Sequence, residues 1–183
     1  MFLHNASSLF LILLLVYLSH WFVDSAITTI SFENRESKSV TSYTSPVESY
    51  VNTTGLNTLL SSNANVTLLI WLAHVYNEDL RFYLLGPDGS NITLSYYRGD
   101  SNDNVFNGTL FTDSASNSVV GYSYKNNVVA TPLRPEQPLS NFRGKNPNGQ
   151  WGLQVDDDFY LDDGQLYGFT LNIQGKKKIF NCQ

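Results

Sequence analysis

The amino-acid sequence predicts an all-β fold, an antiparallel β-sandwich of two sheets with an Ig-like or jelly-roll topology. Three observations support this prediction. Apolar residues recur with a two-residue alternation, turns rich in Gly, Pro and Asn separate the apolar segments, and helical periodicity is nearly absent after residue 25. Short strands that follow one another without intervening helices are typical of sandwiches.

The length and composition of the chain agree with a single packed domain. Of its 183 residues, 42% are hydrophobic and only 15% are charged. The formal net charge of −5 opposes approach to a phosphate backbone, so we expect no nucleic-acid partner. The one cysteine, Cys182, cannot form an internal disulfide, and its place near the end leaves an intermolecular disulfide open.

The N-terminal segment predicts a secretory route. Residues 9–18 form an apolar run that is shorter than the roughly 20 residues a membrane-spanning helix needs, and small residues follow it. We therefore expect residues 1–25 to be a signal peptide, with a signal anchor as the less favoured alternative. A secreted or lumenal protein agrees with the N-x-[ST] glycosylation motifs beyond this segment, at Asn52, Asn65, Asn91 and Asn107.

The first strands are expected after this segment. Residues 26–59 are a Ser/Thr-rich lead-in that contains the first strand or strands, and residues 27–50 are expected to be loosely held. Val66–His74 follows as an inner strand, because both of its faces are largely apolar. One face consists of Val66, Leu68, Ile70, Leu72 and His74, and the other of Thr67, Leu69, Trp71 and Ala73.

A hairpin is expected next in the chain. Leu80–Leu85 and residues 92–97 are two short apolar strands, and residues 86–89 form the turn between them. This turn has a physical basis, since Pro87 presets φ and Gly89 can adopt a positive φ.

Three later strands complete the predicted sandwich, which occupies residues 60–175. Residues 119–124 and 151–155 alternate in hydrophobicity, with Gly149 as a turn residue before the second of them. Trp151, Leu153 and Val155 are expected to point into the core opposite Phe169 and Leu171. One face of the last strand is formed by Tyr167, Phe169, Leu171 and Ile173. A basic tail, residues 176–183, is expected to lie outside the sandwich.

Few residues of the chain suit catalysis. His74 is the only imidazole after the expected signal peptide, and Cys182 lies in the tail. The sequence contains no Gly-rich phosphate loop and no pair of histidines with zinc-ligand spacing. We therefore assign no catalytic residue, and we expect His74, which ends an apolar strand, to be a hydrogen-bonded structural residue.

Carboxylates are the strongest chemical feature of the sequence. Asp156, Asp157, Asp158, Asp162 and Asp163 lie close together between two predicted strands. Such crowding is repulsive unless the groups point into water or share a cation, and Ca²⁺ accepts about 6 to 8 oxygen ligands in flexible geometry. Solvated turn aspartates are the alternative. The predicted calcium ligands include those of a second acidic loop and are Asp156, Asp158, Asp162, Asp163, Asp100 and Asp103.

Several segments, read in chain order, resemble the P domain, also called the Homo B domain, of kexin- and furin-type subtilisin-like serine endopeptidases. LAHVYNEDL (72–80) resembles the family's strand ending in His-Thr before a Gly-Asp-Leu step, and LLGPDGS (84–90) resembles its hairpin turn. PLSNFRG (138–144) and GQWGLQVDD (149–157) resemble its Leu-Ser-x-Phe-x-Gly and Gly-x-Trp-x-Leu-x-Val-x-Asp stretches. The residues that carry the motifs are His74, Asp79, Pro87, Gly89, Gly144, Gly149, Trp151 and Gly164.

This resemblance implies a jelly-roll sandwich of the galactose-binding-like kind with an accessory function. Such a domain packs against a subtilisin-like catalytic domain through apolar surface, stabilises it, and tunes its response to calcium and pH. The catalytic domain with its Asp, His and Ser motifs is missing from this sequence, so the partner is expected in cis in a longer product or in trans.

Two other functions remain open. One is a stand-alone, calcium-dependent adhesion or carbohydrate- or protein-binding sandwich, which would use exposed aromatic residues such as Tyr96, Tyr97 or Tyr160 beside the acidic loops. The other is a hydrolase that uses paired aspartates, of which one would be desolvated in a cleft.

Overall fold

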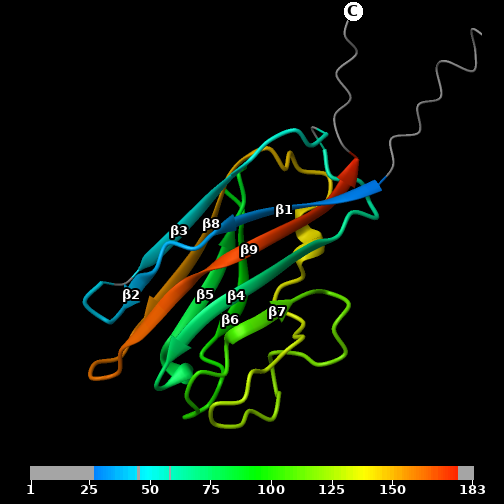
Figure 1. Ribbon diagram of the computed structural model, residues 1–183. Coiled ribbons are helices and arrows are strands. Elements are labelled where there is room, and N and C mark those ends of the chain that lie inside the picture. Colours follow the sequence, from blue (N-terminus) through cyan, green and yellow to red (C-terminus); the bar gives the residue numbers. More distant parts are fainter. Residues whose placement is uncertain (1–26, 45, 58, 177–183) are drawn as a thin grey trace, which may run out of the picture.

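A computed structural model describes residues 27–44, 46–57 and 59–176. It is a sandwich of two antiparallel β-sheets, as predicted (Figure 1). The expected signal peptide or anchor, most of the basic tail and Cys182 lie outside the described residues. In the part that is described, no helix is long and apolar enough to cross a membrane.

The first sheet has five strands in the order β1-β9-β4-β7, with β2 also paired to β9. β1 (Ile27–Asn34) pairs with β9 (Gly164–Lys176) over its whole length, and β2 (Lys38–Val40) pairs with the start of β9. β4 (Val66–His74) lies between β9 and β7 (Asn107–Phe111). The strand predicted to be internal from its two apolar faces is therefore internal.

The second sheet has four strands in the order β3-β8-β5-β6. They are β3 (Val47–Thr53), β8 (Gly149–Asp157), β5 (Leu80–Leu85) and β6 (Asn91–Tyr96). β5 and β6 form the predicted hairpin, and β8 is longer at both ends than the predicted strand at residues 151–155.

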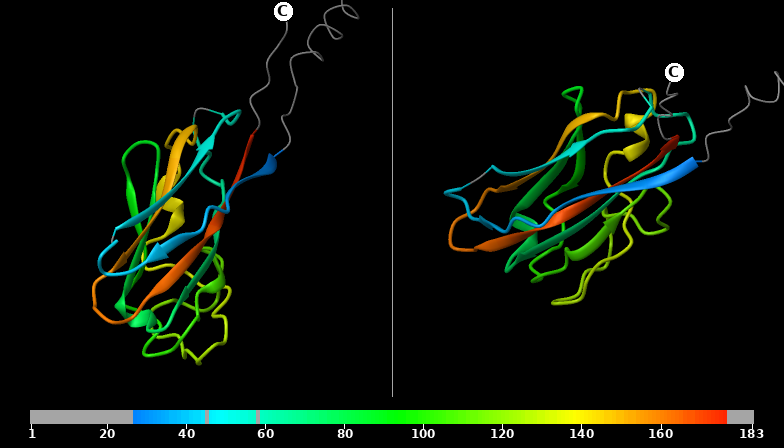
Figure 2. Two further views of the ribbon diagram at one scale, coloured as in Figure 1. Left: turned by 60° about the vertical axis from the view of Figure 1, so that its left-hand side comes forward. Right: turned by 45° about the horizontal axis from the view of Figure 1, so that its top comes forward.

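Two short 3₁₀ helices lie outside the sheets. η1 (Asn77–Asp79) joins β4 to β5, and η2 (Leu139–Phe142) precedes β8. The turned views in Figure 2 show the two sheets as separate layers, with the loops between β7 and η2 gathered beside β7. Among the described residues, loops and these two short helices connect the sheets.

The hydrophobic core lies between the sheets and consists of alternating residues from each. Along β4 every second side chain is buried, from Val66 to His74. Trp151, Leu153 and Val155 of β8 are buried, as are Phe169 and Leu171 of β9 in the opposite sheet, which confirms the predicted placement. Because a large buried apolar side chain contributes about 1.5–3 kcal/mol, these alternating faces are the main source of stability.

The Ser/Thr-rich segment forms outer strands of both sheets rather than a loosely held lead-in. β1 and β2 pair with β9, and β3 pairs with β8. The sequence gives a weak signal here because outer strands bury only part of each face. In β1, for example, no residue is fully buried.

Residues 119–124 do not form the predicted strand. Val119 is buried, and its N–H donates to the Arg134 carbonyl at 2.9 Å, but Gly121 has a φ of +75°, which interrupts an extended backbone. Tyr122 and Tyr124 are partly buried against the core from this irregular loop. The apolar alternation therefore reflects loop residues that reach the core and not a strand.

The last strand has an irregularity that the alternation did not predict. Trp71 pairs with Gly168 and Leu72 pairs with Leu166, so the register between β4 and β9 shifts at Tyr167. As a result Leu166 is buried, whereas Tyr167 is 46% exposed. The prediction that Tyr167 shares a face with Phe169 was therefore wrong. A β-bulge adds one residue to β9 and so reverses the inward-outward alternation before Gly168.

Candidate functional site

One end of the sandwich gathers most of the ionisable residues that the sequence singles out. β4 ends there at His74, β8 ends at Asp157, and β5 and β9 begin there. Antiparallel pairing places His74 opposite Gly164 and Leu80 opposite Asp157. β4 belongs to the first sheet and β8 to the second, and both strands end here. His74 and Asp157, their last residues, therefore meet between the two layers.

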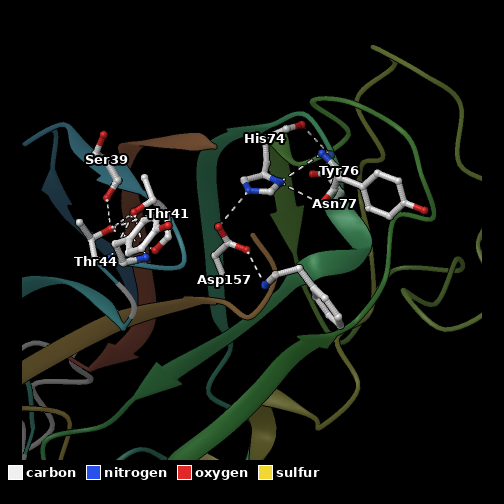
Figure 3. A network of polar contacts seen from close by, with 9 residues as sticks. Ser39, Thr41, Thr44, His74, Tyr76, Asn77 and Asp157 are labelled. Carbon is white, nitrogen blue, oxygen red and sulfur yellow. Dashed lines mark hydrogen bonds and ion pairs between the residues drawn. The ribbon is translucent and has the colours of Figure 1, made fainter. Parts of the chain in front are cut away.

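His74 and Asp157 form a buried polar pair at the centre of this end (Figure 3). The distance from His74 Nε2 to Asp157 Oδ2 is 3.5 Å, and neither side chain is accessible to solvent. On the other side of the ring, His74 Nδ1 lies 2.8 Å from the Tyr76 carbonyl oxygen and 3.2 Å from its backbone nitrogen. The Phe159 N–H donates to Asp157 Oδ1 at 3.3 Å. His74 is thus buried and hydrogen-bonded at Nδ1, and its structural role stays a prediction.

Close packing around the ring explains the glycine at the start of β9. A Cβ at position 164 would overlap the His74 ring and the Ala73 carbonyl oxygen. Gly164 therefore lets β9 approach β4 closely enough to cover His74. Two motif residues from distant segments, His74 and Gly164, act here as one structural unit.

Burial changes the acidity of two carboxyl groups at this end. Desolvation raises the pKa of Asp157, although the hydrogen bond from Phe159 and the nearby His74 oppose that rise. Desolvation also raises the pKa of Asp79, and repulsion from Asp157 and Asp162 adds to it. Both groups therefore hold a proton more readily in the folded protein than in water.

The aspartates on either side of Asp157 contact an arginine. Arg81 Nη2 donates to Asp158 Oδ1 at 2.7 Å and lies 3.4 Å from Asp156 Oδ2. Burial alone would lower the pKa of Arg81, but the hydrogen bond and attraction of Asp158 raise it above its ordinary value. Tyr97 donates to Asp158 Oδ2 at 2.7 Å, and this hydrogen bond raises the pKa of Tyr97 to about 12. Asp156 and Asp158 thus neutralise a cation of the chain itself.

The other predicted calcium ligands lie in two loops. Asp162 and Asp163 are in the loop between β8 and β9, and Asp100 and Asp103 are in the loop after β6. The Asp100 carbonyl accepts the N–H of Glu78, which places this second loop beside η1. Within residues 27–44, 46–57 and 59–176, no group of three or more His, Cys, Asp or Glu side chains is arranged to hold a metal ion. Calcium stays a prediction from the sequence.

The other motif residues lie at turns and in the core. Gly89 and Gly144 have φ values of +80° and +76°, in the region that favours glycine. Trp151 is 1% exposed, packs edge-on against Phe142 with ring centroids 4.6 Å apart, and donates from Nε1 to the Pro147 carbonyl at 2.9 Å. These residues support the fold and do not line the acidic end.

The glycosylation motifs lie at accessible positions for the most part. Asn52, Asn65 and Asn91 are exposed, and Asn107 is half-buried at the start of β7. An exposed asparagine can be reached by the modifying enzyme, but glycosylation itself stays a prediction.

Sequence reasoning named Asp157 and Tyr97 without their contacts, and it did not name Arg81. Asp157 was read as part of a loop cluster, although the alternation that buries Trp151, Leu153 and Val155 continues to it and could have identified it as an inward residue. The contacts of Arg81 and Tyr97 with Asp158 have no local sequence signal, because Asp158 is distant from both in the chain.

Comparison with known proteins agrees with this architecture. The sequence model of the proprotein convertase P-domain family matches residues 63–173, which include β4 to β8 and most of β9. The chain therefore belongs to the proprotein convertase P-domain family. No curated protein matches the chain.

Two similar solved structures come from Aeromonas sobria. One is the crystal structure of its serine protease with the chaperone ORF2, which has 16% sequence identity and a TM-score of 0.53 over 90% of this chain and 29% of that chain. The other is the serine protease itself, with 17% identity and a TM-score of 0.51 over 82% of this chain and 27% of that chain. At these identities the likeness concerns the fold, and this chain spans less than a third of the chains it matches.

Proposed function

We propose that this protein is an accessory domain that binds and stabilises a subtilisin-like serine endopeptidase. The observation that carries the proposal is the P-domain family match, which spans residues 63–173, from before β4 into β9. The similar fold within two serine-protease structures, where it occupies less than a third of the chain, supports the same role.

The proposed role is a non-catalytic one. His74 is the only histidine among the described residues, and its ring is buried with Asp157 out of contact with solvent. A side chain in that position cannot touch a dissolved substrate, whereas it can hold the ends of two sheets together. The stabilising role needs only the folded sandwich and an accessible surface.

Secretion is part of the proposal. The apolar N-terminal run and the exposed asparagines of the glycosylation motifs support a place in the secretory pathway. N-terminal sequencing and glycosidase treatment of the protein from its native source test this part, and an unprocessed, unglycosylated chain would contradict it.

The main test is isolation of the native protein under mild conditions, followed by labelling with a fluorophosphonate that reacts with active-site serines. We expect a labelled subtilisin-like chain, either bound to this protein or continuous with it, together with peptides that identify it. An isolated chain that carries no label and has no partner of this class would overturn the proposal.

A stand-alone binding module is the second candidate, and a specific observation favours it. Tyr96 and Tyr160 are 42% and 67% exposed, and the Tyr96 and Tyr97 ring centroids lie 4.5 Å apart beside the acidic end. Such a solvent-facing aromatic cluster suits ligand binding. Recovery of a lone chain in the experiment above favours this candidate.

Calcium is the proposed cofactor in either case. Its support is the density of aspartates at positions 156–163, of which Asp163 has no ion-pair partner among the described residues. The thermal midpoint of the protein with Ca²⁺ and with a chelator tests the proposal. A midpoint that is the same in both would remove calcium from it.

A further inference from the structure

A groove of about 530 Å³ lies on the surface beside the buried pair. It is bordered by η1, by Tyr97 after β6, and by the loop between β8 and β9. Aromatic rings form much of its wall, and two of them, Phe159 and Tyr160, are 54% and 67% exposed. Large aromatic groups that face solvent around a hollow are an unusual arrangement for a surface that contacts only water.

Contacts with neighbouring residues hold these rings in place. The Tyr97 ring lies edge-on to Phe159 with centroids 6.2 Å apart, and the Tyr97 hydroxyl donates to Asp158. The ring centroids of Tyr160 and Tyr43 lie 5.5 Å apart. The faces of aromatic rings carry partial negative charge, so a fixed set of rings attracts a cation.

The charged residues of the groove are all acidic. Glu78, Asp79 and Asp162 line it, and among the described residues no cationic group lies within 4.0 Å of their carboxylates. Arg81, on the adjoining strand β5, is already engaged by Asp158 and Asp156. Glu78, Asp79 and Asp162 therefore have no ion-pair partner in the described part of the chain.

Asp79 gives an independent indication of a ligand. It is only 7% exposed, it lines the groove, and no described residue donates a hydrogen bond to its carboxylate. Partial desolvation of an ionised carboxylate that has no donor in the described chain is unfavourable. Burial and the charges of Asp157 and Asp162 accordingly raise the pKa of Asp79, so a cation placed in the groove would relieve an existing cost.

We propose that this groove binds an arginine side chain in an extended segment of a partner protein. A guanidinium group stacks flat on aromatic rings and donates two parallel hydrogen bonds to a carboxylate, so it matches both features of the groove. A metal ion is the poorer match, because the described residues offer no group of three metal-ligating side chains. The inference goes beyond the proposed accessory role and does not depend on it.

The test uses the full-length secreted protein and two capped pentapeptides, acetyl-Gly-Ser-Arg-Ser-Gly-amide and its citrulline analogue. Citrulline keeps the shape of arginine but has no charge. By calorimetry or NMR titration at low salt, we expect the arginine peptide to bind with a Kd of about 1 mM or tighter, and the citrulline peptide at least about tenfold more weakly. Equal affinity for the two peptides, or no binding of either, overturns the proposal.

Variants locate the binding site. Glu78→Gln combined with Asp162→Asn is expected to weaken arginine-peptide binding by about tenfold, and Tyr160→Leu by about threefold. Asp163→Asn is the matched control, because it removes the same charge from the same loop but borders a different hollow. It should leave Kd within about twofold. Weakening by Asp163→Asn as large as that by the Glu78→Gln and Asp162→Asn double variant would mean that net charge, and not this groove, binds the peptide.

Other occupants would appear in the same titrations. Suppose that Ca²⁺ binds, that Asp162→Asn abolishes this binding, and that the arginine peptide does not bind. This result overturns the proposal in favour of a metal site. Binding of a neutral oligosaccharide that is lost in Tyr160→Leu but kept in Glu78→Gln, again without peptide binding, overturns it in favour of a glycan site.

Discussion

Gly149 and Pro87 lie against each other at the boundary between β8 and the β5–β6 turn, so closely that a Cβ on Gly149 would be 2.8 Å from the Pro87 Cβ. Gly149 also has a φ of +132°, which L-residues with a side chain rarely adopt. The two residues belong to separate sequence motifs. Their contact fixes the start of β8 beside the hairpin turn.

Gly149→Ala should therefore destabilise the protein for two reasons. We expect a loss of about 2–4 kcal/mol in the free energy of unfolding, from the strained backbone and from overlap with Pro87. Gly89→Ala is the control, because Gly89 also has a positive φ but has no atom within 4 Å of an added Cβ. Urea denaturation of both variants measures the difference, and equal losses would show that the contact with Pro87 contributes nothing.

Trp151→Ala should remove a large part of the core. Trp151 is almost fully buried and packs against Phe142, so we expect a loss of about 3–5 kcal/mol. Trp71→Ala provides a comparison, since Trp71 is only half-buried and its ring stacks with Arg35 at 3.2 Å. Thermal and urea unfolding should show less than half the effect there. A small shift for Trp151→Ala would contradict its placement in the core.

A double-mutant cycle tests the buried pair. His74→Ala should cost about 3–5 kcal/mol, because it leaves the Asp157 carboxyl group buried without the imidazole. Adding Asp157→Asn removes the charge and should recover at least about 1 kcal/mol of that loss. Unfolding free energies of the two single variants and the double variant give the coupling. Strict additivity would mean that the two side chains do not interact.

The acidity of Asp79 predicts a pH dependence of stability. Its pKa is raised by desolvation and by neighbouring carboxylates, so the folded state binds more protons than the unfolded state between the ordinary value of 3.8 and the raised value. Stability from this group therefore falls as pH rises through that window, and the penalty is complete above it.

Asp79→Asn should accordingly be more stable than the natural protein at pH 7. The difference should shrink as pH falls toward the raised pKa and disappear below 3.8. Urea denaturation at several pH values between about 3.5 and 7 measures it. A variant that is less stable than the natural protein at pH 7 would mean that the carboxylate accepts hydrogen bonds that favour its charged form.

Several structural features could be predicted because they depend on local patterns. The alternation of β4 requires one buried face, and the Pro87 and Gly89 turn requires a reversal between two strands. The β8 core residues follow from the same alternation. The errors arose where packing overrides local pattern: Tyr167 lies at a bulge, and residues 119–124 reach the core from a loop.

The site was less predictable than the fold. The sequence identified His74 and a group of aspartates, but it gave no sign that Asp156 and Asp158 contact Arg81. The register of β5 against β8, which pairs Arg81 with Asp156, decides this contact. Register depends on the whole sheet and is not encoded in either strand alone.

The sequence by itself determined the fold class, the inner strand, the hairpin and the inward face of β8, because each depends on spacing between neighbouring residues. Only the tertiary structure decided that Asp157 contacts His74 and that Arg81 forms ion pairs with Asp156 and Asp158. It also decided that Asp79 lines an acidic, aromatic groove. These relationships join residues from separate strands and loops. They therefore depend on sheet order, register and burial, which arise only when the whole chain packs.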